Sequence, residues 1–167
     1  PQEPTKEKDI VKLMVEYLQN PIHRRFSFNQ ESGYHETIEI DGYGPIRAKF
    51  DTGNGTKASM LVVDKIEVSG KNVKWERKGK KFTSKLRGIS KPTHIGKITE
   101  RPIVYINITF NNMIYTNVPI GLQLEDAAST FLINRDLLTR FKVSVNPNRK
   151  FVLSDWSEKG DETDEID

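Results

Sequence analysis

The stretch that decides the fold is residues 46 to 61, "IRAKFDTGNGTKASML". It opens with apolar residues at alternate positions, Ile46, Ala48 and Phe50, which is the pattern of a half-buried β-strand. The strand ends on Asp51, and most of the residues that follow are small or polar. Such an aspartate either caps the backbone amides of a surface turn or is a carboxylate held in place for chemistry. The rest of the chain bears on this choice.

The composition is typical of one soluble globular domain with terminal extensions. The chain has 167 residues, 35% of them hydrophobic, and a mean hydropathy of -0.60, which indicates a real core under a strongly hydrated surface. No run approaches the roughly 18 apolar residues that cross a bilayer, and "PQEPTKEKD" has no apolar signal segment. We expect no membrane contact and a cytoplasmic location, in a host cytoplasm or a virion if the protein is of phage origin.

Metal and cofactor sites find no support in the sequence. The absence of cysteine excludes disulfides, a thiol nucleophile and every cysteine-ligated zinc or iron-sulfur site. His23, His35 and His94 are scattered without metal-ligand spacing. "IGKIT" contains Gly-Lys but lacks the earlier glycine and the following Ser or Thr of a phosphate-binding loop. We therefore expect no metal, no nucleotide and no other cofactor.

Hydrophobic periodicity predicts a mainly β fold with two helices. Apolar residues on one face of residues 6 to 19, ended by Asn20-Pro21, predict a leading amphipathic helix, and "RDLLTRF" predicts a short later one. "HETIEI", the turn "DGYG" and the strand before Asp51 predict a hairpin, and Asn111-Asn112 is a second hairpin turn. Further strands are expected in "SMLVVDKIEVSG", "NVKWERK", "KKFTSKLRG", "RPIVYINITF", "MIYTNVPIGL", "KVSVNP" and "KFVLS". Such short, regularly spaced strands predict a closed or sandwiched antiparallel sheet.

Charge is segregated along the chain. Residues 71 to 87, "KNVKWERKGKKFTSKLR", place eight Lys and Arg around the single acid Glu76, and we call this segment the basic arm. The acidic tail, within "SDWSEKGDETDEID", holds seven acids and one Lys. With Trp75 and Phe82, the basic arm has the composition of a nucleic-acid contact, but we favour a solvated hairpin. Both segments are candidate contacts for an assembly partner or for each other.

A second motif lies about 80 residues after Asp51, where "STFLINRDLL" takes an apolar strand into a polar turn and a helix. With Asp51-Thr52-Gly53 behind a strand, it resembles the retropepsin-like aspartic peptidase family. The resemblance is greatest to the bacterial and phage group of that fold labelled an ATP-dependent zinc protease. "DTGNGTKA" is similar to the group's Asp-Thr-Gly-Ala-x-Thr-Ser-Ala, and "ERPIVYINITF" and "FLINRDLL" are similar to its later motifs. These segments cover about residues 36 to 153.

The resemblance implies an aspartic endopeptidase that hydrolyses peptides or proteins as a homodimer. Each chain would contribute one catalytic carboxylate, Asp51. In the dimer, two such carboxylates about 3 Å apart would share a proton and together activate water. The hydroxyl of Thr52 would form a hydrogen bond across the dimer axis and so brace the two loops. Gly53 would leave room for the substrate backbone and would itself adopt an unusual φ. A flap would close over the cleft from the segment 71 to 96.

The resemblance also implies a fold. It predicts a retropepsin-like closed antiparallel β-barrel over residues 35 to 154, with one short C-terminal helix. An N-terminal helix and connection, residues 1 to 34, and the acidic tail, residues 155 to 167, would be additions.

Three positions depart from the family pattern. Asn54 replaces a small Ala or Ser, and Gly55 lies where retroviral members carry an acid that partners the arginine. Asn134 replaces the glycine before Arg135, and asparagine tolerates left-handed geometry better than most residues. Arg135 and Asp136 also fit an ordinary helix N-terminus with an acid in its first turn. The alternative function is therefore a catalytically inactive retropepsin-like module, a structural or binding component of a larger assembly such as a phage particle.

Overall fold

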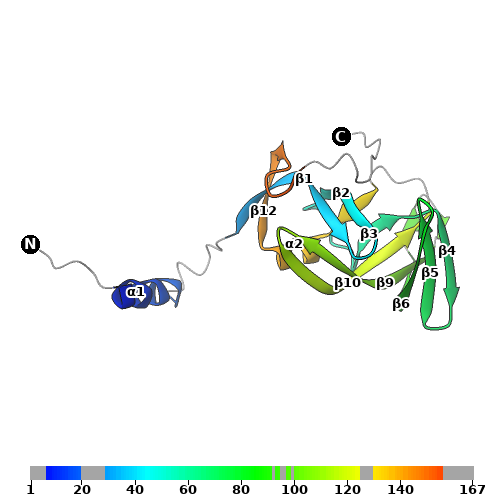
Figure 1. The fold of residues 1–167 in the computed structure, drawn as a ribbon, viewed down its shortest axis with the longest axis horizontal. Coiled ribbons are helices and arrows are strands. Elements are labelled where there is room, and N and C mark those ends of the chain that lie inside the picture. The colour runs from blue at the N-terminus through cyan, green and yellow to red at the C-terminus, as the bar shows by residue number, and fades with distance from the viewer. Residues whose placement is uncertain are drawn as a thin grey trace, which may run out of the picture.

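The computed structural model describes residues 7–19, 29–91, 93–94, 97–98, 100–124 and 130–155, and the described chain is mainly β (Figure 1). The elements in chain order are α1 (Glu7–Gln19), β1 (Gln30–Ile40), β2 (Gly44–Phe50), β3 (Ser59–Val62), β4 (Lys65–Ser69), β5 (Asn72–Arg77), β6 (Lys80–Ser90), β7 (Thr93–His94), β8 (Lys97–Ile98), β9 (Arg101–Phe110), β10 (Met113–Gln123), β11 (Phe131–Ile133), α2 (Arg135–Phe141) and β12 (Val143–Lys150). The mainly β prediction and both predicted helices are confirmed. The predicted domain boundaries stay a prediction.

Helix α1 lies apart from the strands (Figure 1). Glu7 and Asp9 in its first turn favour the helix through the positive end of its dipole. The apolar side chains described for it are exposed, among them Leu13 and Met14 at 59% each. None of the described helices is long and apolar enough to cross a membrane.

Ten strands form one mixed sheet in the order β12-β1-β2-β11-β3-β10-β9-β6-β5-β4, and β1 also pairs with β9. Three of the pairs are parallel: β1 with β12, β10 with β3, and β11 with β2. The prediction of an antiparallel sheet is therefore wrong in part. Alternation along a strand predicts which face is buried but not the direction of the neighbouring strand, and these parallel partners lie far apart in the sequence.

The two predicted hairpins are present. β1 and β2 pair in antiparallel register around the turn at Asp41–Gly44, where Gly42 and Gly44 have φ of 77° and 117°. β9 and β10 join through Asn111 and Asn112, with φ of 50° and 62°. Left-handed backbone at both central residues gives a turn whose twist matches that of the strands, and Asn accepts this conformation at little cost.

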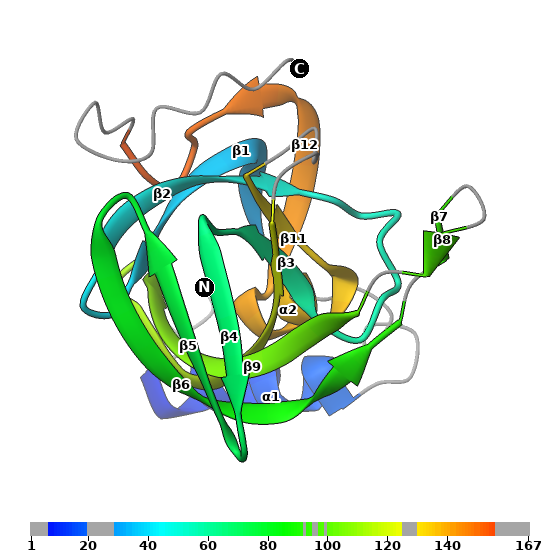
Figure 2. The same cartoon turned by 90° about the vertical axis from the view of Figure 1, so that its right-hand side faces the viewer.

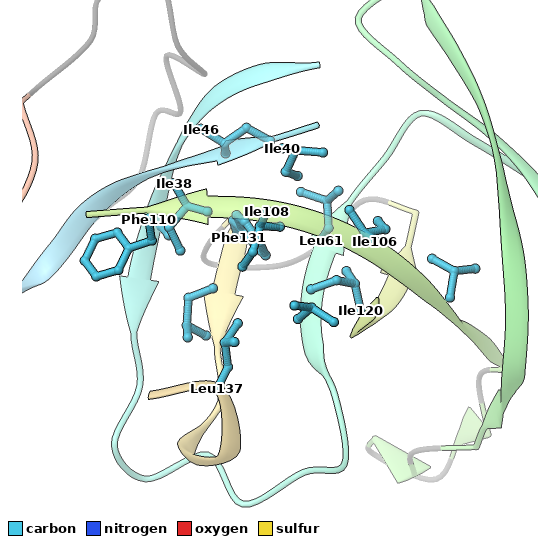
Figure 3. Close-up of a cluster of buried hydrophobic side chains, with 14 of the residues drawn as sticks. Ile38, Ile40, Ile46, Leu61, Ile106, Ile108, Phe110, Ile120, Phe131 and Leu137 are labelled. Carbon is cyan, nitrogen blue, oxygen red and sulfur yellow. The ribbon is translucent and has the colours of Figure 1, made fainter. Parts of the chain in front are cut away.

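The core fills the space between the curved strands and α2. Figure 3 shows the side chains of β1, β2, β3, β9, β10, β11 and α2 converging on one interior. Three aromatic rings join β2, β9 and α2, with centroid distances of 5.4 Å between Phe50 and Phe110 and 4.7 Å between Phe110 and Phe141. This packing fixes the end of β2, the strand that leads into Asp51.

A buried carboxylate holds the segment that follows β12. Glu36 is fully buried, and its oxygens accept hydrogen bonds from the backbone N–H groups of Gly33, Val152, Leu153 and Ser154 and from the Ser154 hydroxyl, at 2.8 to 3.2 Å. These donors compensate for removing the carboxylate from water. We call this arrangement the Glu36 clasp. Of the predicted strand "KFVLS", only Lys150 belongs to a strand, the end of β12; the rest is wrong, because the N–H groups of Val152, Leu153 and Ser154 donate to Glu36 and not to a strand partner.

The basic arm forms β5, β6 and the turn between them, beside β4 at one end of the sheet (Figure 2). The turn has left-handed φ at Lys78 and Gly79, as the Gly79 turn signal predicts. Trp75 is 3% exposed, stacks on Phe82 at 4.3 Å and donates from its ring to the Ser84 hydroxyl. The arm is thus an ordered hairpin with an apolar inner face.

Replacing the carboxylate of the Glu36 clasp tests its contribution to stability. We predict that Glu36→Ala lowers the free energy of unfolding by about 3 kcal/mol, because it leaves several buried N–H groups without an acceptor. Urea unfolding measures this, and hydrogen exchange at Val152 to Ser154 must accelerate. Glu39→Ala, an exposed change on the same strand, is the control and shifts stability by less than about 0.5 kcal/mol. Equal midpoints for the two variants would contradict the assignment.

Candidate functional site

The loop after β2 is held against the loop after β11. β11 pairs in parallel with β2, with Ile133 opposite Phe50, and the Asp51 N–H donates to the Ile133 carbonyl at 3.0 Å. Beyond the ends of these two strands, the Arg135 N–H donates to the Asn54 carbonyl at 2.9 Å. The two motifs singled out in the sequence, about 80 residues apart, are therefore adjacent in space.

Asp51 begins a tight turn. Its Oδ1 accepts from the Gly53 N–H and its carbonyl accepts from the Asn54 N–H, each at 3.1 Å. This is the Asx-turn anticipated for an aspartate at the end of a strand. Asp51 is half-buried, while Thr52 and Gly53 are exposed. The turn thus presents Thr52 and the backbone of Gly53 to solvent.

The unusual φ expected of Gly53 is not found. The glycines with positive φ are Gly42, Gly44, Gly70 and Gly79 among the residues described, and a Cβ at Gly53 would meet only the Asp51 Oδ1, at 3.4 Å. The Asx-turn is closed by Asp51 itself, so no left-handed residue is needed. What glycine provides here is an open surface next to the carboxylate.

Asn134 joins the two loops through hydrogen bonds. It is 2% exposed and lies at the N-cap of α2, where its Oδ1 accepts from the Leu137 N–H at 3.0 Å and from the Ser59 hydroxyl at 3.1 Å. Its Nδ2 donates to the Thr56 carbonyl at 2.8 Å, and its backbone N–H donates to Ser59 Oγ at 3.0 Å. The side chain therefore connects the loop after Asp51, the start of β3 and the start of α2.

The tolerance of asparagine for left-handed geometry is not used at Asn134. Its φ is -80° and its ψ is 170°, which is the extended conformation of an N-cap. A polar side chain at this position makes hydrogen bonds that glycine cannot make. Asn54 has a related role inside the loop, because its Oδ1 accepts from both the N–H and the hydroxyl of Thr56, at 3.0 and 2.6 Å.

Arg135 covers Gly55. A Cβ built on Gly55 would overlap the Arg135 guanidinium group and lie 3.1 Å from its Cζ. The glycine in place of an acid therefore leaves space that the arginine side chain fills. Asp136 is exposed in the first turn of α2, where its charge favours the helix N-terminus as predicted.

Sequence reasoning missed the role of Ser59. Ser59 begins β3 and is 1% exposed, and its alternation with the buried Leu61 signals an inward side chain on an otherwise apolar face. A small polar residue at such a position needs a partner. That signal could have pointed to Asn134, the other buried polar residue of the motifs.

The loop that starts at Asp51 offers one carboxylate. No group of three or more His, Asp or Glu side chains suited to a metal is found among the described residues, and the nearby polar groups are amides and hydroxyls. His35 lies buried on β1, while His23 and the side chain of His94 fall outside the described part of the chain.

Two hollows on the described surface lie near the basic arm. The larger, about 780 Å³, is open and is bordered by β4, β5, β6 and Leu124; the smaller, about 260 Å³, lies between Asp41, Lys85 and Asn107. Neither is lined by residues 51 to 56. Trp75 borders both but is held by Phe82, which favours a packing role over the covering of a substrate.

Comparisons with known proteins give a fold but no family. No family model matches the chain, and none of the curated proteins does. The chain is similar to a solved structure of unknown function (DUF785), Lpg0085 from Legionella pneumophila subsp. pneumophila str. Philadelphia 1, with a TM-score of 0.61 and 24% sequence identity. The match covers 75% of this chain and 99% of that chain, so the Legionella fold has a counterpart here along almost its whole length.

Substitution of Asn134 tests whether it joins the loops. We predict that Asn134→Ala lowers the free energy of unfolding by about 2 to 4 kcal/mol, through loss of the helix cap and of the hydrogen bonds to Ser59 and Thr56. Asn134→Asp keeps the acceptor for Leu137 but loses the donor to Thr56, so its cost is smaller. Chemical denaturation measures both, and exposed Asn72→Ala is the control. A neutral Asn134→Ala would show that the loops are held otherwise.

Proposed function

We propose that this protein is a retropepsin-like aspartic endopeptidase that acts as a homodimer. The observation that carries the proposal is the junction between the two motifs, in which the Asp51 N–H bonds to Ile133 and the Arg135 N–H bonds to Asn54. An isolated Asp-Thr-Gly turn on a surface does not require such a partner. A carboxylate that must keep a fixed position for proton transfer does.

The strand pairings support the closed barrel of that fold. β1, β2, β11, β3, β10 and β9 are paired in this order, and the pairing of β9 with β1 at Ile40 and Ile108 returns to the starting strand. A ring of pairings is what a barrel requires, because closure leaves no free edge within it. In this arrangement Asp51 follows the last residue of β2, next to the end of β11 in the barrel wall.

In the proposed mechanism, two Asp51 carboxylates meet on the two-fold axis and share one proton. Like charges at such a distance cannot both ionise, so one carboxylate takes a proton from water while the other protonates the carbonyl oxygen of the scissile peptide bond. The water oxygen attacks the carbonyl carbon, and collapse of the tetrahedral intermediate transfers a proton to the leaving amine. No metal or cofactor enters this scheme.

The distribution of functional groups supports a dimer. One chain supplies one Asp-Thr-Gly aspartate. A second copy would supply the other carboxylate and the other wall of a cleft. Thr52, exposed at the tip of the turn, would then contact its own copy, and the segment 71 to 96, which contains the basic arm, would provide the flap.

Cleavage assays test the proposal. At mildly acidic pH, the chain should cleave a denatured protein or a peptide library, and Asp51→Asn should lower the rate by at least about a hundredfold, because it removes the acid–base group. Pepstatin-like inhibitors should compete with substrate. Below the dimer dissociation constant, the rate should rise with the square of chain concentration.

Asp41→Asn is the matched control, since Asp41 is exposed in the β1–β2 turn and lies outside the Asp51 loop. It should cleave at the normal rate. If substrates remain intact after long incubation with a confirmed dimer, the peptidase proposal is wrong. That result would favour the second candidate, an inactive module of a larger assembly. That candidate is supported by Asn134, whose structural role explains the second motif without any chemistry.

A further inference from the structure

The outer face of β4, β5 and β6 carries a net excess of cations. Cross-strand register places Lys65 beside Glu76 and Lys81, and Glu67 beside Lys74 and Thr83. Alternation then puts the next members on the same face. The exposed cations of this face are Lys65, Lys74, Lys81, Lys85 and Arg87, and its acids are Glu67 and Glu76. Within this face, the ion pair between Lys65 Nζ and Glu76 Oε2 is long, at 3.9 Å.

The aromatic residues of the basic arm lie on the opposite face. Trp75 pairs with Phe82 across β5 and β6, and both turn toward the core, where Trp75 is 3% exposed. A single-stranded nucleic acid gains much of its affinity by stacking bases on exposed aromatic rings next to cations. Here the cations and the rings are separated by the sheet, which favours an acidic peptide as the partner of this face.

The protein's own C-terminal segment is directed toward the basic arm. β12 runs parallel to β1, and after it the Phe151 N–H bonds to the His35 carbonyl at 2.9 Å. Ser154 Oγ then accepts from the Thr37 N–H at 2.7 Å, and the Asp155 carbonyl accepts from the Thr37 hydroxyl at 2.8 Å. The segment therefore advances along β1 in the direction of its turn, and the Glu36 clasp fixes its course.

The β1–β2 turn touches the basic arm. Lys80 Nζ donates to the Tyr43 carbonyl at 2.7 Å, and the Tyr43 ring lies 6.1 Å from that of Phe82. Thr37 is four residues before Asp41, or about 13 Å along a strand. The twelve residues after Asp155 span at most about 40 Å when extended. The arm is within their reach.

We propose that residues 156 to 167, the part of the acidic tail after Asp155, dock in cis on the cationic outer face of β4, β5 and β6. This part contains Glu158, Asp161, Glu162, Asp164, Glu165 and Asp167 against the single Lys159. Glu36 and Thr37 hold Ser154 and Asp155, the residues that precede it, at a fixed place on β1. The local concentration of tail at the arm is therefore on the order of millimolar, and weak ion pairs suffice. The docking does not depend on the peptidase proposal, and either can fail alone.

Removal of the tail tests the docking. A chain that ends at Asp155 keeps every contact of the Glu36 clasp. Relative to the full chain, it should show amide chemical-shift changes centred on Lys74, Lys81 and Lys85. It should also bind a fluorescent synthetic peptide of residues 156 to 167 at least about fivefold more tightly, since the face is uncovered, and this gain should vanish between about 50 and about 500 mM salt.

Charge variants provide the matched controls. In the shortened chain, Lys74→Ala, Lys81→Ala and Lys85→Ala together should abolish peptide binding, whereas Lys12→Ala with Lys91→Ala, which are exposed elsewhere, should leave it unchanged. An oligothymidylate of about 20 nucleotides distinguishes the other partner class. Equal peptide affinity and unchanged arm amides in the full and shortened chains would overturn the proposal, as would oligothymidylate binding that the tail does not affect.

Discussion

The hydrogen bonds of the Asn134 side chain are the constraint on which the candidate site depends. A buried amide must satisfy both its donor and its acceptor, and Asn134 does so by holding Thr56, Ser59 and the first turn of α2 at once. The parallel pairing of β11 with β2 brings the two loops together, and this amide fixes their relative position.

The same junction gives physical meaning to the departures from the family pattern. Asn134 makes a helix cap where a glycine would make none, and Asn54 closes its own loop through Thr56. Gly55 gives the space of an acidic side chain to the guanidinium of Arg135. These three residues provide the contacts of the loops, and the carboxylate of Asp51 lies at the end of a strand anchored by the Phe50, Phe110 and Phe141 rings.

A second buried polar group organises the other end of the chain. Glu36 gathers the backbone amides after β12 and thereby directs the residues that precede the acidic tail. Asp155, the last described residue, bonds to Thr37 on β1, four residues before the β1–β2 turn, and the basic arm contacts that turn through Lys80. Both buried groups, Asn134 and Glu36, serve to place segments that have no strand partner of their own.

The sequence by itself determined the local elements. Alternation and helical spacing, with Gly and Asn at the turns, were enough to predict α1, α2, the hairpins at Gly42 and Asn111 and the inward side of most strands, because these depend on neighbours a few residues apart. The two motifs also identified Asp51 and Asn134 as candidate site residues. Tertiary structure alone decided the parallel pairings, the N-cap conformation of Asn134, the contact of Arg135 with Gly55 and the burial of Glu36. Each of these depends on a partner in contact across the sheet or across loops, and local periodicity contains no information about which distant segment that partner is.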